Sequence, residues 1–160
     1  MVLPEIVGRD AFAALIIRTD YADETAWQMI VAEVSQPSGA GGEYEARVHL
    51  VDDPVWAGST PAAVRAAVRQ DDQLSVVFVA DRTTMQSAQH PLLALNISDE
   101  DKDLDPMYYQ ELIDSPPAQE FRTTPGAVHD VHANLSLANL DFDGFAEAAL
   151  ADSEGILRPL

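Results

Sequence analysis

Two short apolar runs in the middle of the chain set the expected fold. Val76 to Ala80 and Leu92 to Ile97 flank a polar insert that opens at Asp81. Apolar runs of four to eight residues bounded by turn signals are typical of strands buried on both faces. Such strands lie in the interior of an α/β sheet, so we predict that the rest of the chain packs around them.

The residues before these runs alternate between strand and helix patterns. Apolar segments at 14–20 and 46–51 predict two further strands. Helices are predicted from about residue 24 to 36 and from 61 to about 72, where apolar residues recur every three to four positions. This alternation favours a parallel sheet with right-handed crossovers, in the strand order 2-1-3-4. The insert before the fourth strand is short for a parallel crossover, so that strand could instead run antiparallel.

The C-terminal part adds an edge strand at 120–124, a helix opened by Pro125 and a last helix capped by Asp141. With 160 residues, the chain has the length of one domain. We therefore predict a single three-layer α/β domain over residues 1–160, with a mostly parallel sheet of four to five strands, helices on both faces and a helical C-terminus. Residues 99–117 are predicted to form an acidic surface loop that ends in prolines.

Charge narrows the range of partners. The chain has 27 acidic and 9 basic residues, a formal net charge of −18. Binding to phosphate backbones or anionic membranes requires basic groups, so both are excluded as partners, whereas a basic protein would be attracted. The chain has no cysteine, which excludes disulfides and thiol nucleophiles. With no secretory signal and no apolar run near the ~20 residues of a membrane span, we expect a cytoplasmic protein.

Three of the predicted strands end in aspartate. In open α/β sheets, ligands bind outside the carboxyl ends of strands, where the strand order reverses. The candidate cleft there is formed by Asp20, Asp52, Asp53, Asp81, Arg82, Thr83, Thr84 and His90. Its carboxylates could hold Mg²⁺ together with a substrate phosphate, and Asp20 and Asp81 are then the candidate metal ligands. Alternatively, the same residues terminate strands and cap the following helices.

Other possible sites are incomplete. The alternating aspartates at 99–105 resemble the start of a calcium loop, but Leu104 and Gln110 replace the glycine and the glutamate that the loop needs. His129 and His132 lie one helical turn apart, yet a zinc site needs further ligands. His49 falls inside a predicted strand and is interpreted as structural. No phosphate-binding glycine loop, nucleophile elbow or zinc-protease motif occurs, so no cofactor is predicted beyond possible Mg²⁺.

Several strings in the chain carry a family resemblance. They are Arg18-Thr19-Asp20, Val51-Asp52-Asp53-Pro54, Phe78 to Thr84, His90-Pro91-Leu92-Leu93, Phe121-Arg122 and Asn134 to Asn139. Together they resemble a small bacterial family catalogued as a domain of unknown function and frequent in high-GC soil bacteria. The resemblance covers nearly the whole chain and implies one domain, but it implies no activity.

These observations leave three hypotheses for function. The first is an acidic protein-interaction module, of immunity or regulatory type, that binds a basic partner through its negative charge. The second is a magnesium-dependent hydrolase or phosphotransfer enzyme that uses the strand-end aspartates. The third is a small-ligand sensor at the same cleft.

Overall fold

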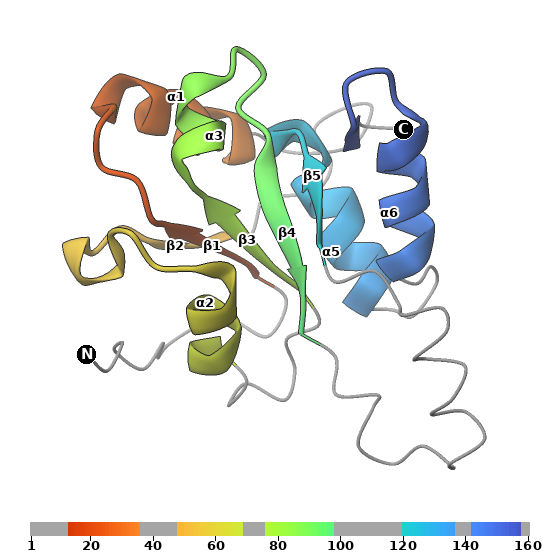
Figure 1. Ribbon diagram of the computed structural model, residues 1–160, viewed down its shortest axis with the longest axis horizontal. Coiled ribbons are helices and arrows are strands. Elements are labelled where there is room, and N and C mark those ends of the chain that lie inside the picture. Colours follow the sequence, from red (N-terminus) through yellow and green to blue (C-terminus); the bar gives the residue numbers. More distant parts are fainter. Residues whose placement is uncertain (1–12, 36–47, 69–75, 98–119, 137–141, 158–160) are drawn as a thin grey trace.

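A six-stranded sheet in the order β2-β1-β3-β4-β5-β6 forms the centre of the protein (Figure 1). The structure is a computed structural model that describes residues 13–35, 48–68, 76–97, 120–136 and 142–157. Its strands are β1 (Ala14–Arg18), β2 (Val48–Val51), β3 (Val76–Ala80), β4 (Leu92–Asn96), β5 (Glu120–Thr123) and β6 (Ile156–Leu157). Its helices are α1 (Glu24–Val34), α2 (Pro61–Val68), α3 (Arg82–Gln86), α5 (Val128–Ser136) and α6 (Phe142–Ala151), with 3₁₀ turns η1 (Pro54–Trp56) and η3 (Pro125–Ala127).

Strand direction follows from the connections. β1 pairs in parallel with β2 and β3, and β5 pairs in parallel with β6. β4 runs antiparallel to both of its neighbours. The predicted order 2-1-3-4 is confirmed, and the fourth strand takes the antiparallel alternative. The connecting helix α3 has only 5 residues, too few to carry the chain back to the other end of the sheet.

The C-terminal part of the sheet differs from the prediction. The sheet has six strands instead of four to five, and the described chain returns to it after α6 instead of ending in a helix. Because β6 is only 2 residues long, it carries no period that a sequence pattern can reveal. The predicted edge strand at 120–124 is therefore internal, since β5 lies between β4 and β6.

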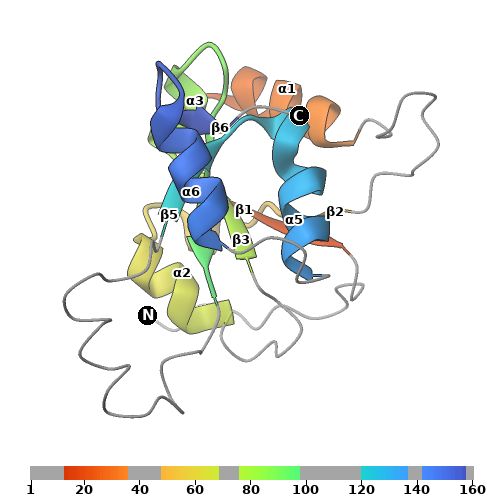
Figure 2. The ribbon, with the colours of Figure 1, turned by 90° about the vertical axis from the view of Figure 1, so that its right-hand side faces the viewer.

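The central strands β1 and β3 are buried along their whole length because helices cover both faces of the sheet. Alternate residues enter two separate cores. One core contains Ile16 and Phe78 and packs against α1, α5 and α6, while the other contains Ile17 and Val79 and packs against Trp56 and α2. Figure 2 shows the molecule turned by 90°, with α2 and α5 on opposite sides of the sheet.

Short polar residues position the helices at the sheet edge. Asp23 caps α1 and accepts a hydrogen bond from Ala26 N at 3.0 Å. The buried positions of α1 follow the helical period: Ala26, Trp27, Ile30 and Val34. No helix in the described ranges is long and apolar enough to cross a bilayer.

Some predictions fall on other parts of the chain. The acidic loop at 99–117, the possible calcium loop within it and the Asp141 cap lie outside the described residues. The same holds for the start of the second strand at residues 46 and 47 and for the expected end of the second helix near residue 72.

Candidate functional site

The strand-end residues lie along one edge of the sheet. The parallel strands β1, β2, β3 and β5 all end there, and the antiparallel β4 starts there. The side chains divide between the two faces of the sheet. Arg18 continues the alternation of Ala14 and Ile16 toward α1, whereas Arg122 stands in register with Leu93 on the α2 face. The edge therefore carries two separate ionic groups.

Arg18 forms the centre of the first group. Its side chain is 2% exposed, and its Nη1 donates to Glu24 Oε2 at 2.8 Å and to Asp52 Oδ1 at 3.3 Å. Its Nε donates to the carbonyl oxygen of Asp20 at 2.9 Å. The guanidinium also lies over the rings of Tyr21, 4.3 Å from the centroid, and Trp27, 5.3 Å from the centroid. Arg18 thus joins the ends of β1 and β2 to the start of α1.

Five carboxylates lie after β1 and β2 and at the start of α1, and two of them, Glu24 and Asp52, pair with this arginine. We call Asp20, Asp23, Glu24, Asp52 and Asp53 the acidic rim. All are exposed except Asp20, which is half-buried. Three of them also hold the local backbone, since Asp20 accepts from Ala22 N, Asp23 from Ala26 N and Asp53 from Val55 N. One guanidinium against five carboxylates gives the group a formal charge of −4.

The electrostatics of the rim are visible at Tyr21 and Glu24. Burial, followed by the negative charge of Asp52, raises the pKa of the Tyr21 hydroxyl to about 12. At Glu24, the hydrogen bond from Gln28 and then the one from Arg18 lower the pKa of the carboxyl. Asp52 therefore disfavours a negative charge at Tyr21, whereas Gln28 and Arg18 favour the charged form of Glu24.

The pKa of Tyr21 gives a first testable prediction. Subtracting the tyrosinate absorbance titration of Tyr21→Phe from that of the wild type is expected to isolate one hydroxyl with a pKa of about 12. Asp52→Ala is expected to lower this pKa while leaving it above the ordinary value of about 10, because burial is the larger cause. Above about pH 10 the Tyr21 hydroxyl ionises in the unfolded chain but not yet in the folded protein. The free energy of unfolding therefore falls with rising pH until the folded hydroxyl also ionises. A difference titration centred near pH 10 would contradict the buried environment.

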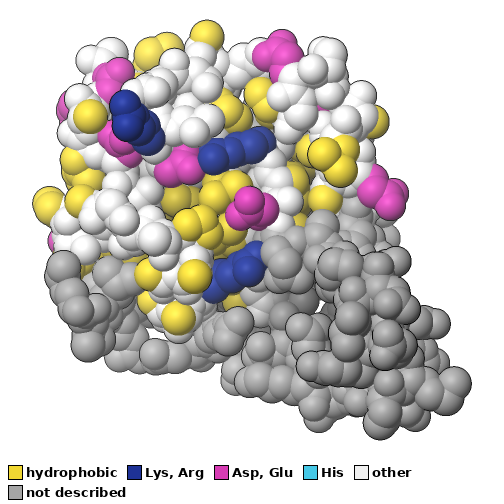
Figure 3. Space-filling view, viewed as in Figure 1, with side chains coloured by type: hydrophobic (Ala, Val, Ile, Leu, Met, Phe, Trp, Pro, Cys, Tyr) yellow, Lys and Arg dark blue, Asp and Glu magenta, His cyan; other side chains and the backbone are white. Residues whose placement is uncertain are grey.

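Asp81 and Arg122 form the second ionic group. Arg122 donates from Nη1 to Asp81 Oδ1 at 2.8 Å and from Nη2 to Asp81 Oδ2 at 2.9 Å, a bidentate pair in which each side chain is about one quarter exposed. Arg122 Nη1 also donates to the carbonyl oxygen of Pro91 at 3.3 Å. The pair therefore fastens β5 to the end of β3 and the start of β4. Figure 3 shows the α2 side of the molecule, where acidic and basic side chains border an area of apolar ones.

Asp81 also starts α3. Its Oδ1 accepts from Thr84 N at 3.1 Å and from Thr84 Oγ1 at 3.0 Å, and its own N–H donates to Thr84 Oγ1 at 3.2 Å. This is a reciprocal capping box. Burial raises the pKa of Asp81, but Arg122 and Thr84 together outweigh burial and lower it. Asp81 is thus occupied by internal donors, and the next residue, Arg82, is exposed.

Thr84 and His90 complete this corner. Thr84 is fully buried, and its hydroxyl lies 2.8 Å from the carbonyl oxygen of Pro91. The His90 Nδ1 contacts the carbonyl oxygen of Thr84 at 3.1 Å and must carry the proton, because that oxygen can only accept. His90, immediately before Pro91, adopts a left-handed φ of 49°. The remaining predicted residue, Thr83, is exposed on α3.

The predicted site residues therefore come together in two sets. Asp20 and Asp52 contact Arg18, and Asp53 adjoins Asp52. Asp81 pairs with Arg122, and Thr84 contacts both Asp81 and His90. Arg82 and Thr83 are exposed on α3 and belong to neither set. Within the described residues, no three His, Asp or Glu side chains converge closely enough to hold a metal ion.

The histidines named by the sequence lie elsewhere. His129 Nε2 donates to the carbonyl oxygen of Val34 at 2.7 Å and so closes the C-terminal end of α1. His132 is buried, 5% exposed, and His49 lies half-buried in β2.

Three important residues were missing from the predicted cleft: Arg18, Tyr21 and Arg122. A signal for two of them exists in the sequence. Arg18 continues a buried apolar strand, where a cation requires counter-charges, and Arg122 follows the apolar Phe121 in a strand next to Leu93. Tyr21 gives no such signal, because one aromatic residue in a loop has many possible roles.

Comparison with known proteins places the chain in a family. No curated protein matches it. The model of one family matches residues 13–160, which cover every strand and helix described above, and this agrees with the resemblance drawn from the sequence strings. The chain therefore belongs to the family described as Domain of unknown function (DUF6924).

Proposed function

We propose that this protein is an acidic protein-interaction module, of immunity or regulatory type, which binds a basic partner at the acidic rim. The observation that carries the proposal is the rim itself, five carboxylates after β1 and β2 and at the start of α1, two of which pair with one buried guanidinium. Four of the five are exposed. A cationic side chain of a partner can therefore contact these carboxylates without any change in the fold.

The net charge supports the same function. A formal charge of −18 attracts a basic partner over long range, and the rim supplies a local site at which that attraction becomes contact. Attraction between exposed charges is screened within about 8 Å at physiological salt. Binding is therefore expected to weaken strongly as salt increases.

The hydrogen bonds of Asp81 favour a binding function over a catalytic one. A metal-dependent hydrolase would need Asp81 beside Asp20 as a ligand, but both Asp81 oxygens receive hydrogen bonds from Arg122 and one also receives them from Thr84. Asp81 is thus used to build the sheet edge. These hydrogen bonds leave Asp81 few lone pairs with which to bind a small ligand. They therefore also count against a small-ligand sensor that uses Asp81.

A pair of matched variants tests the proposal. D20N/D23N/D53N removes three charges from the rim, and asparagine keeps the backbone hydrogen bonds that each aspartate accepts. It also leaves both carboxylate partners of Arg18 in place. Affinity for a hexa-arginine peptide, measured by fluorescence anisotropy at low salt, is expected to fall about 10-fold, because each exposed pair contributes a few tenths of a kcal/mol or more.

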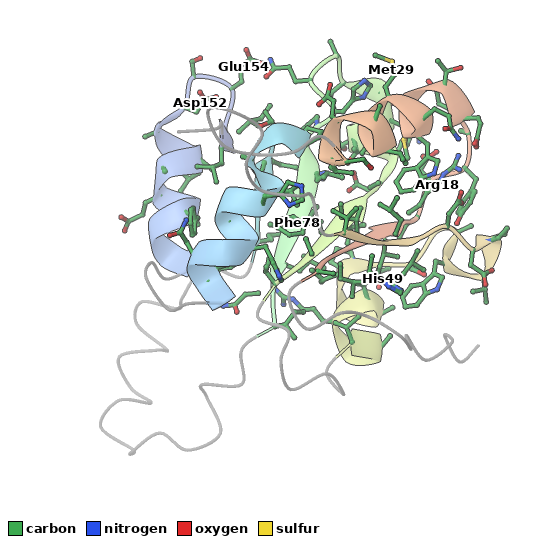
Figure 4. All side chains as sticks on the ribbon, turned by 180° about the vertical axis from the view of Figure 1, so that it is seen from behind. Arg18, Met29, His49, Phe78, Asp152 and Glu154 are labelled. Carbon is green, nitrogen blue, oxygen red and sulfur yellow. The ribbon has the colours of Figure 1, made fainter. Side chains whose placement is uncertain are left out.

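The control removes the same charge elsewhere. E147Q/D152N/E154Q lies on α6 and the turn after it, and the asparagine that replaces Asp152 can still accept from the N–H groups of residues 154 and 156. Figure 4 shows Asp152 and Glu154 at the opposite side of the molecule from Arg18. This variant is expected to bind hexa-arginine within about twofold of wild type, as distant charges act only through screened fields. Equal losses in both triple variants would show that net charge alone attracts the peptide.

A further inference from the structure

Two buried polar atoms inside the acidic rim lack hydrogen-bond partners among the described residues. One is Nη2 of Arg18, whose side chain is 2% exposed, and the other is the hydroxyl oxygen of Tyr21. The Tyr21 hydroxyl lies beside Asp52 but does not reach hydrogen-bond geometry with it. A buried donor without a partner is costly, above all on a charged group. The two atoms belong to side chains that contact each other, since the guanidinium lies over the Tyr21 ring, and together they point to a group that binds there.

The chemistry of that group follows from its neighbours. Arg18 Nη2 can only donate, and Tyr21 Oη offers a second donor, so the missing group presents an acceptor oxygen. A free anion is disfavoured, because Asp52 and Glu24 already contact the same guanidinium and the rim has a formal charge of −4. A neutral carbonyl oxygen that arrives together with a positive charge satisfies both conditions. A main-chain carbonyl of a basic peptide segment has this combination.

We propose that Arg18 Nη2 and the Tyr21 hydroxyl receive a main-chain carbonyl oxygen of the basic partner, while the surrounding carboxylates bind its Lys or Arg side chain. The inference rests on the proposed function and specifies its partner as a peptide segment. Access requires a local movement, since Nη2 is buried and the Tyr21 ring lies over the guanidinium at 4.3 Å. Tyr21 lies in the loop between β1 and α1, so we expect its ring to shift enough to admit the carbonyl oxygen while its hydroxyl still reaches that oxygen.

Two probes separate carbonyl recognition from charge attraction. Hexa-arginine carries both cations and carbonyl groups, whereas spermine carries cations without any carbonyl. Arg18→Met adds one net negative charge to the rim, so it is expected to tighten spermine binding. The same variant is expected to weaken hexa-arginine binding about 5-fold, because the lost hydrogen bonds outweigh the gain in charge. Opposite signs for the two probes, measured by calorimetry, would be the signature of the carbonyl contact.

Two further variants test whether a change in folding, instead of the lost carbonyl contact, causes these effects. Tyr21→Phe keeps the ring and its contact with Arg18 and is expected to weaken hexa-arginine about 3-fold while leaving spermine unchanged. Arg82→Met removes an exposed cation on α3 and is expected to leave the ratio of the two affinities unchanged. If Arg18→Met tightens both probes and Tyr21→Phe changes neither, the carbonyl contact is overturned while the proposed function stands. If neither probe binds wild type better than D20N/D23N/D53N, the proposed function itself fails.

Discussion

Replacing Asp81 with alanine is expected to lower the free energy of unfolding by about 3 kcal/mol. The substitution removes the N-cap of α3, worth about 1 kcal/mol, and leaves the half-buried Arg122 without its bidentate partner, a loss of about 2 kcal/mol. The effect is large for one surface-edge residue because three elements, β3, α3 and β5, depend on the same carboxylate. Denaturant unfolding followed by circular dichroism measures it.

Two related variants divide this loss into its parts. Asp81→Asn can still cap α3 but carries no charge, so it is expected to cost about 1 to 2 kcal/mol. Arg122→Met is expected to cost a similar amount, and the double variant less than the sum, because both remove the same pair. Additive losses would contradict a direct interaction between the two side chains.

Low pH reduces the contribution of Asp81 to the free energy of unfolding. The pKa of Asp81 is lower in the folded protein than in the unfolded chain, so its contribution is complete above about pH 4. Below this pH the unfolded chain takes up the proton first, and the contribution falls until folded Asp81 is also protonated. The stability difference between wild type and Asp81→Asn is therefore expected to narrow as the pH falls below about 4.

Removing Asp52 is expected to destabilise the protein by about 2 kcal/mol, and removing Arg18 as well is expected to restore most of that loss. Arg18 is almost fully buried, so in Asp52→Ala its charge retains only Glu24 as a carboxylate partner. Breaking a buried pair on one side costs about 3 to 5 kcal/mol, and the value is lower here because Asp52 is 43% exposed. In R18M/D52A no buried charge remains.

The single variant Arg18→Met completes this comparison. It is expected to lie within about 1 kcal/mol of wild type, because methionine fills the volume of the arginine stem and contacts the same aromatic rings, while the freed carboxylates are hydrated. Thermal unfolding of the three variants gives the answer. If R18M/D52A were no more stable than Asp52→Ala, Arg18 itself would stabilise the fold. Stability alone would then explain why a buried arginine occupies this position.

The sequence patterns predicted the arrangement of the central strands well. Apolar runs at Val76 to Ala80 and Leu92 to Ile97 mark strands buried on both faces, and the first four strands pair in the predicted order 2-1-3-4. Patterns of this kind succeed because burial on two faces demands apolar residues at every position. The short β6 has no such pattern, since two residues can be apolar for many reasons.

The sequence predicted the aspartates at the strand ends but not the arginines that pair with them. Aspartates at strand ends were found, whereas the cations that hold them, Arg18 and Arg122, come from a buried strand position and from a strand 41 residues after Asp81. Sequence spacing contains no information on which acid meets which base across a sheet. The alternation of side chains then decides that Asp52 and Asp81 serve different faces, and this requires knowing the register of every strand.

The reversal of β4 also bears on how the sheet assembles. β3, α3 and β4 are contiguous in the chain, so their pairing closes a short loop and loses little chain entropy. The parallel pairing of β1 with β2 and β3 must instead wait for two long crossovers. We therefore expect β3 and β4 to nucleate folding and the β1–β2 side to dock last. Because β1 is buried along its whole length between β2 and β3, the carboxylates at the ends of β1 and β2 reach their final positions only when the sheet is complete.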